Sequence, residues 1–196
     1  MSNNYTFEYD LNNNNHLTVY SGRPDDTRLP VEERCYDLLD SLGISYARVD
    51  HPQADTIEDC ETIGQALGFP VCKNLFLTNR QQTDFYLLLM EGHKPFKTKH
   101  LSKQLGVSRL SFAGSDAMES LLGVAPGSVS VLGLMNDTQH RLRLVMDRGV
   151  YEGEYICCHP CKNTSTLKIK TTDILSAVLP HIGHDITVVD LPIDDE

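Results

Sequence analysis

Lys73 and Asn74 stand side by side where a turn-forming stretch, GFP at 68–70, gives way to the apolar run LFL at 75–77. The ammonium group of a lysine can hold a phosphate or stabilise a developing oxyanion, and an asparagine amide can orient a polar group of a substrate. Taken alone, a lysine in such a place is typical of a solvated surface. The chemistry of Lys73 therefore depends on the residues that the fold brings beside it.

The sequence Cys158-His159-Pro160-Cys161 is a second group that could carry chemistry. A structural zinc site needs a second ligand pair at suitable spacing, and the other cysteines do not supply one. A redox C-x-x-C lies at a strand-to-helix junction, whereas this one leads into the polar run KNTST. We expect incidental or buried thiols, no metal and no cofactor, and a cysteine-based metal or redox protein stays a weaker alternative.

A third group is basic. Between His93 and Ser115 the chain has no Asp or Glu, and it carries there Lys94, Lys97, Lys99, Lys103 and Arg109. The net charge of −10 argues against wholesale nucleic-acid binding, because phosphate contacts drive such affinity. The cluster is either a solvated helix face or a small docking patch for a phosphate backbone.

Helix and strand patterns alternate along the chain and must position these groups. Apolar spacing predicts a helix from Pro30 to Gly43, and Thr56 with Asp59 predicts an N-capped helix that ends at Gly68. The β-prone runs 73–79 and 84–91 are predicted to form a hairpin, with Lys73 and Asn74 at the opening of its first strand.

The remaining pattern predicts more of both kinds of element. Helices are expected at 97–106, from a Ser115 cap to Gly123, and after a cap formed by Thr172 and Asp173. Strands are expected at 44–51, 108–113, 141–147, 151–160, 165–170 and 185–191, and the stretch 123–133 is rich in turns. The fold class is therefore mixed α/β, without the order of a Rossmann fold or its glycine-rich loop.

Length and composition favour one domain. The 196 residues are 40% hydrophobic, and residues 1–28 form a polar, Asn-rich extension to a domain at 29–196. The longest apolar runs, such as FYLLLM at 85–90, are far below the ~20 residues of a membrane-spanning helix. The first fifteen residues lack a secretory signal, so we expect a cytoplasmic protein.

From about His51 to Pro192 the chain resembles the YbaK-type aminoacyl-tRNA deacylase family, also called prolyl-tRNA-synthetase-associated domains. The resemblance rests on KNLFL at 73–77, LGVAPGSVS at 122–130 and HPCKNTST at 159–166, in this order. It implies a single YbaK-type domain with a mixed, barrel-like central sheet flanked by helices. The chain looks most like the free-standing editing proteins that hydrolyse alanine mischarged onto proline tRNA.

The resemblance also implies roles for particular residues. Lys73, Asn74 and His159 are expected to be catalytic, and the loop Gly127, Ser128, Val129 and Ser130 to bind the substrate. In the family this loop is a Gly-x-x-x-Pro motif, and Val131 stands here in place of the proline, which frees the backbone and restores an N–H. The basic residues Lys94, Lys97, Lys99, Lys103 and Arg109 are the expected tRNA contact.

The implied function is a trans-editing hydrolase for alanyl-tRNA(Pro). A ribose hydroxyl of the substrate could assist the attacking water, so no protein base, metal or cofactor is required. The expected partners are the acceptor end of mischarged proline tRNA and prolyl-tRNA synthetase, with no membrane. A module that binds aminoacyl-tRNA without hydrolysing it is the main alternative, because a shared fold does not guarantee activity.

Overall fold

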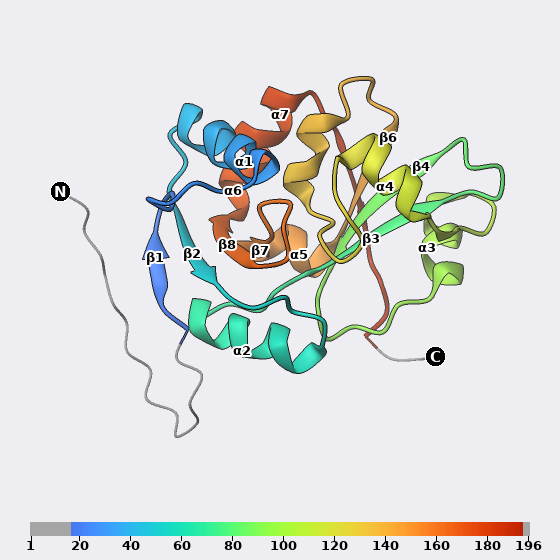
Figure 1. Cartoon of the computed structure of the whole chain (residues 1–196). Coiled ribbons are helices and arrows are strands. Elements are labelled where there is room, and N and C mark those ends of the chain that lie inside the picture. Colours follow the sequence, from blue (N-terminus) through green and yellow to red (C-terminus); the bar gives the residue numbers. More distant parts are fainter. Residues whose placement is uncertain (1–16, 194–196) are drawn as a thin grey trace.

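The computed structural model describes residues 17–193, which form two β-sheets with helices around them (Figure 1). The first sheet is antiparallel, in the order β1 (Val19–Ser21), β2 (Tyr46–Asp50), β8 (Ser165–Lys170) and β7 (Tyr155–Cys158). The second is mixed, in the order β5 (Ser111–Phe112), β3 (Lys73–Thr78), β4 (Phe85–Met90), β6 (Leu142–Asp147) and β9 (Ile186–Val189). The predicted mixed α/β class is confirmed.

The prediction of a barrel-like sheet is wrong. Within residues 17–193, β1 and β7 are the edges of one sheet and β5 and β9 the edges of the other, whereas a closed barrel gives every strand two neighbours. The sheets approach each other where Cys72 N–H donates to Cys157 O at 3.4 Å. Pro70 has no N–H and lies just before this contact, so the segment cannot extend it into a ladder.

The helices lie on the faces and ends of the sheets. They are α1 (Pro30–Ser41), α2 (Ile57–Leu67), α3 (Thr98–Leu105), α4 (Ser115–Leu122), the 3-10 helix η1 (Val131–Asn136), α5 (Arg148–Glu152), and a last helix built from α6 (Thr171–Asp173), the π-turn η2 (Ile174–Val178) and α7 (Leu179–Ile182). Figure 1 shows α2 across the lower side of the molecule, near β2. No helix in the described part of the chain is long and apolar enough to cross a membrane.

The predicted cap of α2 is confirmed. Thr56 Oγ1 accepts the N–H of Asp59 at 3.1 Å, and the Asp59 carboxylate accepts the N–H of Thr56 at 3.0 Å. This reciprocal pair satisfies two N–H groups that a helix start leaves without partners. At the other end Gly68 is left-handed, with φ +64°, which suits a residue without a Cβ. Helix α2 therefore begins and ends where its sequence predicts.

Three local predictions are wrong. Ser115 is the first residue of α4 and its side chain does not cap the helix, because Gly114 holds the capping position. Helix α5 takes the first part of the predicted strand 151–160, since the backbone becomes extended only at Gly153. The last helix begins at Thr171, one residue before the predicted Thr172 and Asp173 cap.

Strand β4 runs between two apolar cores. Phe85, Leu87 and Leu89 face the larger core, with α1, η1 and η2. Tyr86, Leu88 and Met90 face the smaller core, with α3 and β9. Side chains alternate along a strand, so a strand buried on both faces needs a continuous apolar run, and FYLLLM provides it.

Part of the predicted N-terminal extension, residues 1–28, belongs to the first sheet, because β1 lies within it. Val19 pairs with Val49 of β2, and Arg23 forms an ion pair with Asp37 of α1 at 2.7 Å. Residues 1–16 lie outside the described part of the chain. The boundary at residue 28 stays a prediction.

Candidate functional site

A cleft of about 770 Å³ opens between α2, the start of β3 and the loop that follows β4. Five of the predicted site residues line it although they are far apart in the sequence: Lys73, Asn74, Gly127, Val129 and His159. The antiparallel pairing of β3 with β4 places Lys73 opposite Met90, so the first residues of β3 lie beside the loop after β4. The two sheets and their loops therefore bring the three sequence motifs to one cavity.

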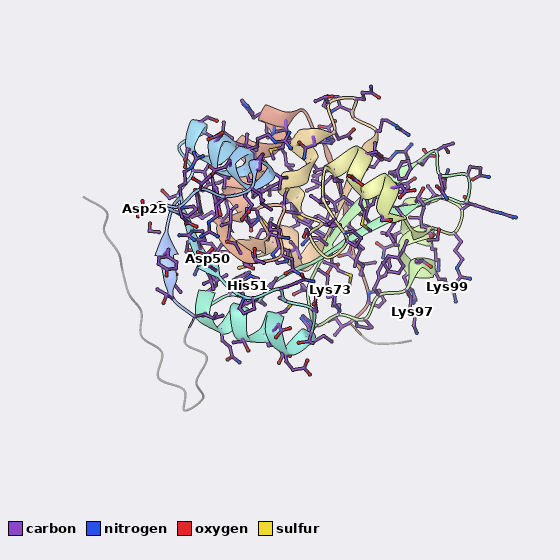
Figure 2. The ribbon with its side chains drawn as sticks, viewed as in Figure 1. Asp25, Asp50, His51, Lys73, Lys97 and Lys99 are labelled. Atoms are coloured by element: carbon purple, nitrogen blue, oxygen red, sulfur yellow. The ribbon has the colours of Figure 1, made fainter. Side chains whose placement is uncertain are left out.

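Lys73 is held at this cleft by a backbone carbonyl. Its ammonium group donates a hydrogen bond to Lys94 O at 2.8 Å. A neutral acceptor fixes the direction of the side chain but does not cancel its charge, so the ammonium can still attract an anion. In Figure 2, Lys73 is labelled between His51 and the two lysines near α3, Lys97 and Lys99.

Lys94, a predicted tRNA contact, is placed in a buried ion pair. The residue is 7% exposed, and its ammonium lies 2.7 Å from Asp147 Oδ2 and 2.8 Å from Glu91 Oε2. Asp147 is fully buried, and its other oxygen accepts the N–H of Leu191 at 3.0 Å. Because its charge is already compensated inside the protein, Lys94 is not part of a surface for phosphates. It fixes the loop whose carbonyl holds Lys73.

Asn74 presents an oxygen atom without a donor. Its amide nitrogen donates to Cys72 O at 3.3 Å, which sets the orientation of the amide. The oxygen Oδ1 is buried and has no hydrogen-bond partner among the described residues. A buried acceptor without a donor is costly, and a donor from a bound molecule would satisfy it.

The hydrogen bonds of His159 determine which ring nitrogen carries the proton. Nδ1 lies 2.8 Å from Ser165 O, and a carbonyl oxygen can only accept, so Nδ1 must be the N–H. In the neutral ring Nε2 is then a lone-pair acceptor. Burial lowers the pKa of His159 below the usual range of histidine, which favours this neutral form. His159 thus offers an acceptor to the cleft.

A second histidine, His51, is linked to His159 through Thr166. His51 Nδ1 lies 2.7 Å from Pro52 O, so it also is an N–H, and His51 Nε2 accepts the hydroxyl of Thr166 at 2.9 Å. The oxygen of Thr166 lies 3.4 Å from His159 Nδ1. Both His51 and Thr166 are buried. The Ser165 carbonyl sets the tautomer of His159, and the chain His51–Thr166–His159 supports the position of its ring.

The sequence interpretation did not include His51 or Thr166 in the site. Both had a signal: His51 ends a predicted strand before a proline, and Thr166 lies in the quoted motif HPCKNTST. Their partnership depends on the register of β2 against β8, in which Asp50 lies opposite Ser165. That register cannot be read from either strand alone.

The residues of the loop 127–130 have two roles: two of them line the cleft, and the other two hold the loop in place. Gly127, with φ +83°, and Val129 line the cleft. Ser128 Oγ instead accepts the N–H of Asn163 at 3.1 Å, and Ser130 Oγ accepts the N–H of Leu132 at 3.2 Å at the start of η1. These two serines hold the loop, and neither is among the residues that line the cleft.

Asn163 joins this loop to the segment before α2. Its side chain donates to Ala54 O at 2.8 Å and accepts the N–H of Ala54 at 3.3 Å. Val131, at the position of the family proline, is fully buried as the first residue of η1. Packing and these hydrogen bonds restrain the loop by a route that does not require proline.

The remaining basic residues lie on the surface around α3. Lys97, Lys99, Lys103 and Arg109 are exposed, in contrast to Lys94. Beside them Phe112 and His93 line the cleft and are also exposed. Phe112 and His93 thus line the cleft, and the four cations lie on or next to α3, outside the residues that line it.

The cysteine motif is placed inside the protein. Cys158 is fully buried and Cys161 is 2% exposed. Burial raises the pKa of the Cys158 thiol well above its ordinary value, which disfavours the reactive thiolate. Within residues 17–193, no three His, Cys, Asp or Glu side chains gather as a metal site. The structure gives the cysteine-based alternative no support of its own.

Comparison with known proteins places this cleft in a family. The family model described as the aminoacyl-tRNA editing domain matches residues 51–177. The prolyl-tRNA editing protein ProX of Acetoanaerobium sticklandii is 29% identical over 136 residues, which are 69% of this chain and 83% of that protein. The prolyl-tRNA synthetase associated domain-containing protein 1 of Danio rerio is 32% identical over 154 residues, 78% of this chain and 81% of that protein.

Solved structures share the fold. A crystal structure described as a candidate trans-editing enzyme for prolyl-tRNA synthetase aligns with a TM-score of 0.61 at 16% identity, over 85% of this chain and 100% of that one. At this identity the likeness concerns the fold alone. The family model covers more than half of the chain, including the whole cleft from Ala54 to His159. The chain belongs to the aminoacyl-tRNA editing domain family.

Proposed function

We propose that this protein is a trans-editing deacylase that hydrolyses the ester of a mischarged tRNA, with alanyl-tRNA(Pro) as its substrate. The observation that carries the proposal is the meeting of Lys73, Asn74, Gly127 and His159 in one cleft of a chain of the editing family. The names of the relatives, which refer to prolyl-tRNA editing and to prolyl-tRNA synthetase, support the same substrate class.

The cleft offers complementary groups to an aminoacyl ester. The Lys73 ammonium can bind a terminal phosphate or the oxyanion that forms at the carbonyl carbon. Asn74 Oδ1 is an acceptor without a donor among the described residues, and the α-ammonium of the amino acid is a donor of matching kind. His159 Nε2 can accept a proton or hydrogen bond from the attacking water or a ribose hydroxyl.

The reaction needs only water as a co-reactant. Water adds to the carbonyl carbon, and the bond to the ribose oxygen then breaks. That oxygen takes a proton, so the products are the free amino acid and the uncharged tRNA. The ribose hydroxyl beside the ester can assist the water, which leaves positioning and charge stabilisation to the protein.

Selectivity would come from the restrained loop. Gly127 and Val129 line the cleft, and Asn163 ties their loop to Ala54. A synthetase gains only ~1–3 kcal/mol from a methylene group, so a second site that admits alanine and rejects proline restores fidelity. A rigid wall rejects the larger amino acid better than a flexible one.

The tRNA would approach over the α3 side of the cleft. Lys97, Lys99, Lys103 and Arg109 form the proposed contact with the phosphate backbone, and Lys94 is left out because its charge is paired inside the protein. Such an enzyme would work in the cytoplasm, where prolyl-tRNA synthetase is the second proposed partner. The domain proposed for this activity is residues 29–196.

A non-catalytic aminoacyl-tRNA-binding module is the second candidate, because Val131 replaces the proline of the family loop. Such a module would bind alanyl-tRNA(Pro) in the same cleft and leave the ester intact. The buried position of Val131 and the bonds of Ser130 and Asn163 favour a working loop.

The test is the release of alanine from alanyl-tRNA(Pro) by the full chain and two variants. Lys73→Ala should lower kcat by about 10²- to 10³-fold, the usual effect of removing a group that stabilises an oxyanion. Lys170→Ala is the matched control, because Lys170 is exposed and lies outside the cleft. Tight binding of alanyl-tRNA with no release of alanine by the wild type would favour the binding module. Equal rates for Lys73→Ala and wild type would remove Lys73 from the mechanism.

A further inference from the structure

Phe112 is the most exposed aromatic side chain among the described residues. It is 61% exposed, and it lies on the rim of the cleft in the short edge strand β5. The antiparallel register places Phe112 opposite Leu77. Side chains of directly opposite residues share a face of the sheet, and residues two apart along a strand do as well. Phe112 therefore lies on the face of β3 that carries Lys73 and Leu75.

A second aromatic ring supports the first. The rings of Phe96 and Phe112 have centroids 6.0 Å apart at an interplanar angle of 68°, an edge-to-face contact. Phe96 itself packs against the smaller core, which includes Leu101 and Leu110. The Phe112 ring is thus anchored on one side while most of its surface stays in solvent.

The stretch of chain that carries both rings, residues 93–115, is basic and has no Asp or Glu. Lys97 follows Phe96 directly, and Lys99 and Arg109 are exposed on the same acid-free stretch of the chain, 93–115. Proteins that bind single-stranded nucleic acids combine exposed aromatic rings with cations. The bases stack on the rings, and the phosphates pair with the positive charges. A protein partner would call for a wider apolar patch than one ring provides.

We propose that Phe112, supported by Phe96, stacks with an unpaired base at the 3′ end of the tRNA, while Lys97, Lys99 and Arg109 meet the neighbouring phosphates. The inference rests on the proposed function, because the terminal nucleotide of the tRNA carries the ester. A base on Phe112 would hold that nucleotide at the rim and direct its ribose toward Lys73.

The absence of tryptophan from the sequence gives a direct test. In Phe112→Trp the new indole is the single fluorophore of its kind, and we expect saturable quenching by a single-stranded oligoribonucleotide that ends in CCA. An abasic oligomer of the same length and charge should quench much less, because it has phosphates but no bases. Tyr151→Trp is the control, since Tyr151 is exposed on α5 and does not line the cleft.

Kinetics supply a second measurement. Phe112→Ala should raise KM for alanyl-tRNA(Pro) by roughly 5- to 100-fold, the range for loss of one base–aromatic stack, with a smaller change in kcat. Phe112→Tyr, which keeps the ring, should restore KM. Equal quenching by the CCA and abasic oligomers, or an unchanged KM in Phe112→Ala, would overturn the inference.

The two proposals fail differently. If the wild type hydrolyses no aminoacyl-tRNA while the CCA oligomer still quenches Trp at position 112 selectively, the stacking surface stands and the hydrolase proposal falls. If the wild type releases alanine but the CCA oligomer does not quench the Phe112→Trp variant, the hydrolase proposal stands and the stacking surface falls.

Discussion

Lys73 and Lys94 show how surroundings assign different tasks to the same side chain. Lys94 lies between Glu91 and Asp147, and its charge is used inside the protein. Lys73 instead donates to a backbone carbonyl, and it lines the cleft. The carbonyl belongs to Lys94, so the buried ion pair also sets where the ammonium of Lys73 lies.

The buried ion pair of Lys94 with Asp147 predicts a large effect on stability when Lys94 is replaced. Lys94→Met leaves the buried Asp147 carboxylate without its cation, and the free energy of unfolding should fall by about 3–5 kcal/mol. Lys103→Met, on the exposed side of α3, should change it by no more than about 0.5 kcal/mol. Urea denaturation followed by circular dichroism measures both variants. Equal losses would contradict a buried role for Lys94.

The order of the buried chain His51–Thr166–His159 predicts a positioning role for Thr166. Thr166→Val keeps the shape but loses the hydroxyl, and kcat for deacylation should fall roughly five- to tenfold, the worth of one hydrogen bond, with KM little changed. Thr166→Ser should restore the rate. Nitrogen NMR of the imidazoles detects the lost hydrogen bond between Thr166 and His51 Nε2 without any activity assay.

A reading in which Thr166 only fills space predicts something different. Thr166→Val would then match wild type in both rate and imidazole signals, and that outcome would exclude the positioning role.

At the residue scale, sequence motifs selected Lys73, Asn74 and His159. They could not reveal that Lys94 is buried or that His51 reaches Thr166, because both facts depend on contacts between distant segments.

At the scale of elements, the cleft depends on close contact between the loop after β4 and the segment before β3. A Cβ added to Gly92 would lie 2.6 Å from Val71 O, which is backbone and cannot rotate away. Gly92 lines the cleft and is two residues from Lys94, whose carbonyl holds Lys73. The glycine therefore permits the approach that places the lysine.

Gly92→Ala should consequently push the two segments apart. We expect the free energy of unfolding to fall by about 1–3 kcal/mol, as for other overpacked sites, together with a loss of deacylation rate. Gly114→Ala is the control, since nothing lies within 4 Å of the added Cβ there and its φ is negative. It should change stability by less than about 1 kcal/mol. Denaturation midpoints that do not differ between the variants would contradict the contact.

Elements with strong local signals were predicted well, and those set by distant partners were not. The capping box fixed α2, and the two β-prone runs formed the predicted hairpin of β3 and β4. Helix α5 was missed because its five residues carry too little periodicity to predict a helix. The short strand β1 lies in the polar extension, where the sequence has no strong strand signal, and it is held by its pairing with β2.

At the scale of the whole molecule, the patterns gave the α/β class but not the pairing of the sheets. Whether the edge strands meet depends on segments such as 69–72 that have no regular pattern. The same long-range arrangement buries titratable groups, and it makes the stability of the fold depend on pH.

Two buried histidines predict the direction of this dependence. Burial lowers the pKa of His159 and of His184 in the folded protein. The unfolded chain then takes up protons near pH ~6.5 that the folded protein does not, so the free energy of unfolding falls as the pH drops from 7 toward 5. Urea midpoints across this window measure the slope, and His184→Gln should reduce it. Rising stability on acidification would contradict the buried neutral state.

The central claim is that the cleft hydrolyses the ester of a small mischarged amino acid and spares the correct one. Its most direct measurement is the ratio of kcat/KM for alanyl-tRNA(Pro) to that for prolyl-tRNA(Pro), determined with the purified full chain. We predict a preference for alanine of roughly 10²-fold, the selectivity that a pocket of restricted size can provide. Equal rates for the two esters, faster release of proline, or no release of either amino acid would contradict the proposal.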